Sequence, residues 1–256
     1  MMHARRESVL TLRGYGVGHG CRFTLESANL ELPSQGITVL LGPSGTGKST
    51  LLRALSGEGQ CNPSLSTVGE SRYCLEGAFP VLVAQNIRLL ASSIFENLVK
   101  DWPGRSTRTI AQQRAYLDDW LASLGQESLG RNLHLPVAEL PLHKQRLVAI
   151  LRAALLGTPL ILLDEPTAGL SAAQSEPILA LLRQIGKRQA MLVAMHHLAQ
   201  SRSLADQILL IASRKIQEFS PAESFFTEPH SEAGRLFLST GSCPEEPYPT
   251  VQKERQ

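Results

Sequence analysis

The sequence predicts an α/β fold built on a mostly parallel sheet. Short apolar runs alternate with helical segments along much of the chain of 256 residues. Two of these runs, LILLD and AMLVAM, are too short for buried helices and lack polar alternation. That pattern is typical of strands covered on both faces. Strands and helices that alternate in this way favour a parallel sheet.

The individual elements follow from local patterns. A strand in GITVLL runs into a glycine-rich loop, which opens the helix STLLRALS. The run PVLVAQ (Pro80–Gln85) predicts a second buried strand. The segment SAAQSEPILALLRQIG predicts a helix with Ser171 as its N-cap. The runs QILLIA and KIQEF predict a final pair of strands, and a short helix is expected over Ser224–Phe226.

A helical insert interrupts this sheet. Residues 86 to about 140 carry helical spacing and no clear strand, and RTIAQQRAYLDDWLASLG predicts a helix that ends at Gly125. We expect one domain over 1–238, with core segments 9–85 and 146–220 and a helical subdomain over 86–145. Residues 239–256 are rich in Pro, Glu and Gly, and we expect them to be disordered.

Composition excludes several classes of protein. The net charge of +2 and the scattered Lys and Arg residues predict no nucleic-acid partner. The four cysteines have no metal-ligand spacing, which favours reduced thiols in a cytosolic protein. No run has the apolar length of a signal peptide or a membrane span. Any membrane role is therefore expected to come through a partner.

The segment GPSGTGKST matches the phosphate-binding pattern G-x-x-x-x-G-K-[ST] between a strand and a helix. The glycines let main-chain N–H groups point at phosphate oxygens, and the helix N-terminus adds its positive dipole end. Lys48 would reach the β- and γ-phosphates and Ser49 would hold Mg²⁺. The expected ATP-binding residues of the loop are Gly42, Pro43, Ser44, Gly45, Thr46, Gly47, Lys48, Ser49 and Thr50.

An acidic pair supplies the second half of the site. Asp164 ends the strand LILLD, where its carboxylate can bind Mg²⁺, and Glu165 follows as a candidate general base. An Asp-Glu pair after a strand is also compatible with an ordinary turn.

With these two motifs the chain resembles the nucleotide-binding subunit of an ATP-binding cassette (ABC) transporter over 9–238. The resemblance implies a P-loop NTPase core with a small antiparallel β subdomain and a helical subdomain insert. It implies ATP and Mg²⁺ as ligands and Gln85 as a residue that senses the metal and the membrane partner. His196 matches the family's γ-phosphate histidine, while His197 stands where the family usually has Asp. A helix-capping or surface role is the alternative for either histidine.

The resemblance also implies an aromatic residue that stacks on adenine ahead of the phosphate loop. Tyr15 and His19 are the two candidates, and we prefer Tyr15 on chemical grounds. The segments SSIFENL and FFTEPHSEAGRLFL resemble parts of importer ATPases for phosphate and polar amino acids.

The chain departs from the family at the signature L-S-G-G-Q, which binds the γ-phosphate held by the opposite subunit. One register places Leu140, Pro141, Leu142, His143 and Lys144 there, and a second begins at Glu139. Pro141 has neither a hydroxyl nor an N–H, and Leu142 is bulky where glycine permits close approach. Ser171 also replaces the Asp that usually ends the loop after the acidic pair.

Three explanations remain open. The chain could pair with a different cassette subunit that carries an intact signature, or form a homodimer in which His143 and Lys144 act as cationic donors. It could also bind ATP as a slowly hydrolysing regulatory subunit. Glu165 and His196 favour an active ATPase.

The resemblance implies a subunit that powers a membrane transporter, and importer likeness favours a small polar or anionic solute. Its partners would be transmembrane permease subunits, a second ABC ATPase subunit and, for an importer, a substrate-binding protein. Its place would be the cytoplasmic side of the cell membrane. The alternatives are a soluble regulatory or nucleic-acid cassette protein and a P-loop kinase. The interval between Lys48 and Asp164 has no room for a long coiled coil, which argues against chromosome-maintenance cassettes.

Overall fold

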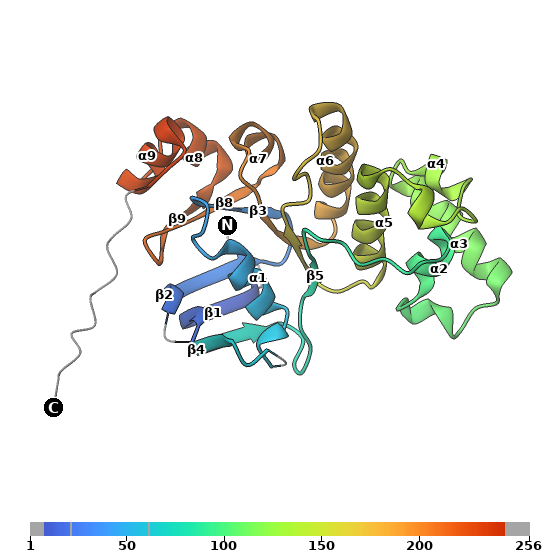
Figure 1. Ribbon diagram of the computed structural model, residues 1–256, viewed down its shortest axis with the longest axis horizontal. Coiled ribbons are helices and arrows are strands. Elements are labelled where there is room, and N and C mark those ends of the chain that lie inside the picture. The colour runs from blue at the N-terminus through green and yellow to red at the C-terminus, as the bar shows by residue number, and fades with distance from the viewer. Residues whose placement is uncertain (1–7, 21, 61, 244–256) are drawn as a thin grey trace, which may run out of the picture.

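Two sheets lie on either side of the first helix in the computed structural model, which describes residues 8–20, 22–60 and 62–243 (Figure 1). The smaller sheet is antiparallel, with the order β2-β1-β4. Its strands are β1 (Ser8–His19), β2 (Arg22–Pro33) and β4 (Leu65–Tyr73). This sheet confirms the small antiparallel unit that the family resemblance implies.

The larger sheet has the order β5-β6-β7-β3-β8-β9, and only β9 runs antiparallel to its neighbour. The mostly parallel sheet is therefore confirmed. Its strands are β3 (Ile37–Leu41), β5 (Val81–Val83), β6 (Leu160–Asp164), β7 (Ala190–Ala194), β8 (Gln207–Ala212) and β9 (Lys215–Pro221).

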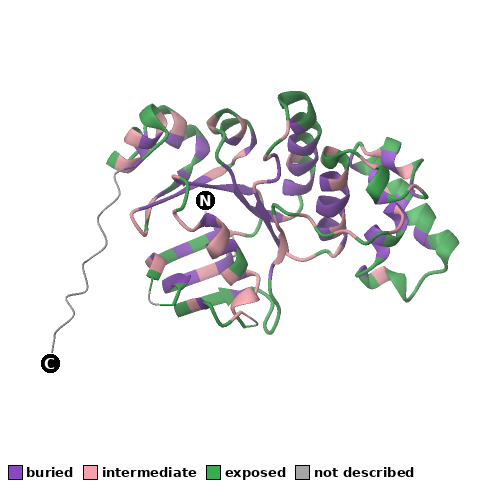
Figure 2. Ribbon diagram, viewed as in Figure 1, coloured by how far each residue is buried: buried purple, intermediate pink, exposed green. Residues whose placement is uncertain are grey.

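Both faces of the larger sheet are covered, which explains why its strands read as continuous apolar runs. Every residue of β3, β6 and β7 is buried (Figure 2). One face, with Leu40, Leu162 and Leu192, packs against α1 (Lys48–Leu55) and the antiparallel sheet. The other face packs against α5 (Leu142–Leu155), α6 (Ala172–Gly186) and α7 (Leu198–Leu204).

The stretch between β5 and α5 is helical, as its spacing predicts, and it forms the lobe at the right of Figure 1. Its helices are α2 (Ile94–Val99), α3 (Ile110–Ser123) and α4 (Glu127–Gly130), with short 3₁₀ turns at Pro103–Arg105 and Val137–Glu139. Thr109 starts α3 with a capping box, and Ser171 caps α6 in the same way, as predicted. The division of the chain at 86 and 145 stays a prediction.

Two helices follow the last strand. The short helix predicted near Ser224 is α8 (Ala222–Thr227), and α9 (Glu232–Thr240) comes after it. This last helix extends past the expected boundary at 238, and Cys243 beyond it is buried. The rest of the predicted tail, 244–256, lies outside the described residues.

A buried carboxylate fastens α9 to the sheet. Glu218 of β9 is 6% exposed and accepts hydrogen bonds from Ser220 Oγ, His230 N, Ser231 N and Ser231 Oγ. Burial raises the pKa of Glu218, but the hydrogen bonds outweigh it and leave this pKa below its ordinary value. The carboxylate therefore holds the start of α9 in its charged form.

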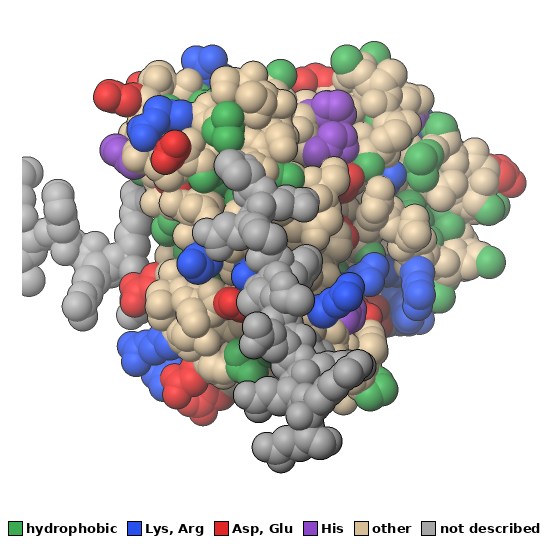
Figure 3. All heavy atoms as spheres, turned by 60° about the vertical axis from the view of Figure 1, so that its left-hand side comes forward, with side chains coloured by type: hydrophobic (Ala, Val, Ile, Leu, Met, Phe, Trp, Pro, Cys, Tyr) green, Lys and Arg blue, Asp and Glu red, His purple; other side chains and the backbone are tan. Residues whose placement is uncertain are grey.

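The surface gives no sign of a single-sign charged face in the view of Figure 3, where acidic and basic side chains are interspersed. Across the described residues, no helix is both long enough and apolar enough to span a bilayer.

Candidate functional site

The phosphate loop connects the end of β3 to the start of α1. Gly45 and Gly47 have φ angles of +82° and +88°, a region that side chains other than glycine rarely adopt. A Cβ at Gly47 would lie 2.3 Å from Thr24 Oγ1, so the loop packs closely against β2. Thr46 closes the turn by donating its hydroxyl to Pro43 O over 2.9 Å. The backbone thus has the tight glycine-dependent path that an oxyanion cradle needs.

Lys48 points back over this loop. Its ammonium donates to Gly42 O at 2.7 Å and to Pro43 O at 2.9 Å, and the residue is only 8% exposed. Burial lowers the pKa of Lys48, and the nearby carboxylates of Glu165 and Asp164 oppose that shift. Neutral carbonyls of the loop therefore hold the Lys48 ammonium. No carboxylate hydrogen-bonds to it among these contacts, so its charge is available to an anion.

Ser49 meets Asp164 across the cleft. The Ser49 hydroxyl donates to Asp164 Oδ1 at 3.0 Å, although the two residues are 115 positions apart. Burial raises the pKa of Asp164, while the bond from Ser49 lowers it. The hydrogen bond brings two side-chain oxygens together, one from the first turn of α1 and one from the end of β6.

Glu165 and His196 also come together. Glu165 Oε2 lies 3.2 Å from His196 Nδ1, and both side chains are partly exposed. Glu165 has a φ of +48°, an uncommon backbone conformation for a residue with a side chain. Its N–H donates to Ala194 O at 3.0 Å, which anchors this turn to β7. His197 is the N-cap residue of α7, and its ring lies 4.2 Å from the His196 ring.

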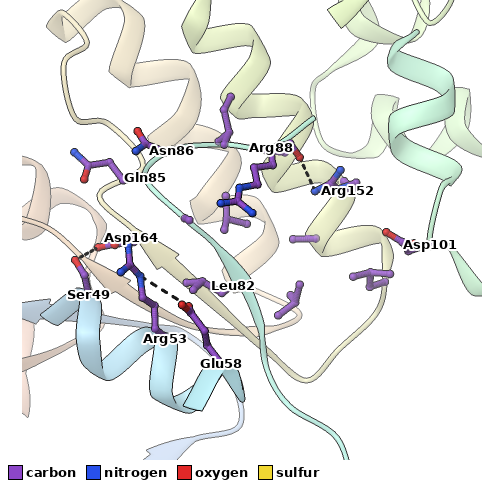
Figure 4. A pocket seen from close by; sticks show the side chains of 17 residues that line it. Ser49, Arg53, Glu58, Leu82, Gln85, Asn86, Arg88, Asp101, Arg152 and Asp164 are labelled. Atoms are coloured by element: carbon purple, nitrogen blue, oxygen red, sulfur yellow. Dashed lines mark hydrogen bonds and ion pairs between the residues drawn. The ribbon is translucent and has the colours of Figure 1, made fainter. Parts of the chain in front are cut away.

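Gln85 lies in the same region, just after β5. With Ser49 and Asp164 it lines a groove of about 700 Å³. Figure 4 shows Gln85 at one end of this groove, near Ser49 and Asp164, while Arg88 and Arg152 lie toward the other end. The predicted metal-binding residues thus share one cleft.

The preference for Tyr15 as the adenine-stacking residue is wrong. Tyr15 is 4% exposed within the core that joins the antiparallel sheet to α1, so its ring has no free face for a base. Burial raises its pKa to about 12. His19 is exposed at the end of β1, and the strand paired with it there carries Thr24, which touches the phosphate loop. His19 therefore stays the candidate for adenine contact.

The signature region forms the start of α5. Pro141 is the N-cap residue and supplies no side-chain cap, and Leu142 is 46% exposed at the first helical position. The Pro141 carbonyl accepts from Lys144 N at 2.9 Å, and Gln145 Nε2 donates to Leu140 O at 2.8 Å. His143 Nδ1 is buried without a hydrogen-bond partner. The helix forms normally despite its unusual first turn, because proline is tolerated there.

Three sets of contacts in or near this cleft were not predicted. Arg53 lies one helical turn after Ser49 and pairs loosely with Glu58 at 3.9 Å, and spacing along α1 could have identified it. Arg146 of α5 donates to the carbonyls of Pro166 and Ala168. Thr167 Oγ1 donates to Gln200 Oε1 at 2.7 Å. No local pattern in the sequence connects these last two sets of residues.

A glycine-rich loop between a strand and a helix of a mostly parallel sheet defines a P-loop nucleotide-binding fold. A family profile described as ABC transporter matches residues 25–168. The chain therefore belongs to the ABC transporter family, and it is an ATPase of that type. Proteins of this family bind ATP, and Mg²⁺ is generally required.

Two curated relatives match this chain over most of its length and over most of their own length. The phosphate import ATP-binding protein PstB of Mycobacterium intracellulare is 27% identical over 86% of this chain and 82% of its own. The probable amino-acid import ATP-binding protein YxeO of Bacillus subtilis is 28% identical over 87% and 93%. Among solved structures, cbiO1 from Clostridium perfringens, described as part of the ABC transporter complex cbiONQ, has a TM-score of 0.70 at 19% identity. That structure covers 92% of this chain and 96% of its own, and it supports the fold.

Proposed function

We propose that this chain hydrolyses ATP to power a membrane transporter that imports a small polar or anionic solute. The observation that carries the proposal is the convergence of Lys48, the Ser49–Asp164 bond and the Glu165–His196 pair at one edge of the sheet. Names of relatives from phosphate and amino-acid import support the choice of solute class.

The triphosphate binds to the loop from Gly42 to Thr50. Main-chain N–H groups and the Lys48 ammonium neutralise the phosphate oxygens. His19 contacts the base from the end of β1, beside the strand that packs on Gly47.

The residues present fit Mg²⁺. Ser49 Oγ and Asp164 Oδ1 are neighbouring oxygen ligands, and Gln85 lines the same groove. Mg²⁺ usually takes one or two carboxylates and completes its shell with water and substrate phosphates. The metal would neutralise charge on the phosphate oxygens.

Glu165 is the general base for hydrolysis. It accepts a proton from a water molecule as the water oxygen bonds to the γ-phosphorus and the bond to the bridging oxygen breaks, leaving ADP and phosphate. His196 lies within 3.2 Å of Glu165, so its ring orients that carboxylate and faces the γ-phosphate side of the cleft.

The first turn of α5 makes this subunit a poor donor to a nucleotide on an opposite subunit. The exposed Leu142 side chain stands where close backbone approach is needed, and Pro141 offers no N–H. Pairing with a second cassette subunit that carries an intact signature would then give one strong and one weak ATP site. A homodimer using His143 and Lys144 is the second arrangement. A slowly hydrolysing regulatory subunit is the third.

The groove beside Gln85 is the surface for a membrane permease, which would hold the chain on the cytoplasmic face of the membrane. Its position between α1, β5 and α5 lets movement of the nucleotide site reach the groove wall directly. An importer would add a substrate-binding protein.

Affinity purification of the tagged chain from detergent-solubilised membranes of its host tests this function. We expect a membrane-spanning permease and a second cassette subunit to co-purify, and the complex to hydrolyse ATP. Lys48→Ala in the same complex is the control for hydrolysis by contaminants. Recovery of the chain only as a single soluble species would favour the regulatory alternative.

A further inference from the structure

Two contacts join the same pair of segments at the hydrolytic end of the cleft. The first is the Glu165–His196 pair at 3.2 Å. The second is the hydrogen bond from Thr167 Oγ1 to Gln200 Oε1 at 2.7 Å. One contact alone would let the turn after β6 pivot against the start of α7. A second contact, displaced along both segments, removes that freedom.

Backbone hydrogen bonds also hold the turn that carries Thr167, and Leu170 packs against the core. Ala168 N donates to Glu165 O at 3.1 Å and Leu170 N donates to Thr167 O at 3.2 Å. On the side of α5, buried Arg146 donates to the Pro166 and Ala168 carbonyls. Thr167 itself is 4% exposed, so its hydroxyl bond is shielded from water.

Glu165 depends on this support because its backbone lies in the left-handed region, with a φ of +48°. Such conformations persist only where the surroundings hold them. Gln200 is a suitable anchor because α7 is itself fixed. Arg183 of α6 donates to Ser203 O and to Ser203 Oγ, both at 3.2 Å, and Leu204 at the end of α7 is buried in the core.

We propose that Thr167 and Gln200 are positioning residues that hold Glu165 and His196 in register for hydrolysis. Neither side chain contacts ATP in this role. The proposal rests on the proposed function, because it assigns these residues to the ATPase site. Misplacement of a catalytic group by about 1 Å lowers turnover by roughly 10²-fold. Loss of the bond should therefore lower kcat and leave the KM for ATP nearly unchanged, because the phosphate loop is untouched.

Four variants separate the hydrogen bond from packing. Thr167→Val keeps the shape and removes the hydroxyl, whereas Thr167→Ser keeps the hydroxyl. Gln200→Leu removes the acceptor, whereas Gln200→Glu keeps an acceptor oxygen. Thr158→Val is the matched control, because the Thr158 hydroxyl bonds only weakly, to Leu160 O at 3.4 Å, away from the cleft.

ATPase assays on the purified complex should show kcat lowered about ten- to a hundredfold in Thr167→Val and Gln200→Leu. Thr167→Ser, Gln200→Glu and Thr158→Val should stay near the parent rate. The double variant Thr167→Val/Gln200→Leu should be no slower than either single variant, since both remove one bond. The proposal would be overturned if Thr167→Val kept the kcat of the parent. It would also be overturned if Thr167→Ser lost as much kcat as Thr167→Val.

Hydrogen exchange gives a readout that does not need activity. Amides of residues 165–171 should exchange faster in Thr167→Val than in the parent, with an unchanged unfolding temperature. Unchanged exchange there would also overturn the proposal. A parent complex that binds ATP without hydrolysing it would instead contradict the proposed function, while the exchange experiment still tests the contact.

Discussion

The Ser49 hydroxyl donates to Asp164 Oδ1 across 3.0 Å, which joins the first turn of α1 to the end of β6. Ser49 follows Lys48, which is expected to bind phosphate. Asp164 precedes Glu165, which is the expected general base. This contact therefore links the start of α1, next to the phosphate loop, to the strand end that carries Glu165. The predictions below test what each side of the contact does.

Glu165→Gln should retain ATP and lose hydrolysis. The amide keeps the size of the side chain but cannot accept a proton from water, and a general base contributes typically 10²–10⁴-fold. We expect turnover to fall within that range while ATP affinity changes little, and nucleotide-dependent dimers to accumulate on gel filtration. Glu176→Gln is the matched control, because the Glu176 side chain is exposed on α6. Turnover at the parent rate would mean that Glu165 is not the base.

His19→Ala should weaken ATP binding because the candidate base contact is lost. Stacking on a base is worth about 1–3 kcal/mol, so the dissociation constant should rise roughly 5- to 150-fold. Affinity for inorganic triphosphate should not change, since the phosphate loop is intact. Tyr15→Phe should bind ATP as the parent does, because the Tyr15 ring is buried. If His19→Ala bound both ligands normally, His19 would have no role in adenine contact.

Pro141→Ser with Leu142→Gly should raise ATP turnover of the isolated chain. The pair restores a hydroxyl, an N–H and room for close approach, and one phosphate contact is worth about 10²–10³ in turnover. Leu75→Gly is the control, because Leu75 is 45% exposed against 46% for Leu142. An unchanged rate would contradict the view that this turn limits hydrolysis, and would favour a heterologous partner subunit.

Glu218→Gln should change the acid stability of the protein. The folded pKa of Glu218 lies below its ordinary value, so the carboxylate stabilises the fold above the unfolded pKa. That stability is lost as the pH falls through the folded pKa. We expect the variant to cost about 1–3 kcal/mol at neutral pH and to show a flatter decline below about pH 4.5 in urea titrations. Exposed Glu223→Gln is the control; if both variants declined alike, Glu218 would not hold α9 by its charge.

The sequence predicted the elements that carry strong local signals. Apolar runs located β3, β6, β7 and β8, and glycine spacing located the phosphate loop. Ser171 was identified as a cap because capping depends on neighbouring residues only. The helix α9 was not predicted, since its apolar face is short and its fixing contact comes from Glu218 on β9.

The site residues show the same difference between local signals and packing. Motif residues that follow strands were brought together as predicted, including Ser49, Asp164 and His196. Tyr15 failed because the register of β1 decides which face of the strand is buried, and the bulges near this residue change that alternation. The Thr167–Gln200 bond depends on how a turn and a helix pack, which no short pattern records.

The central claim is that a triphosphate binds to the main-chain amides of Gly42 to Thr50 beside the Lys48 ammonium. Titration calorimetry of the parent and of Lys48→Ala with ATP and Mg²⁺ tests it most directly, with exposed Lys187→Ala as the control. We predict saturable binding to the parent and to Lys187→Ala, and its loss in Lys48→Ala. A parent chain that takes up no nucleotide at millimolar ATP, or Lys48→Ala that binds as the parent does, would contradict the account.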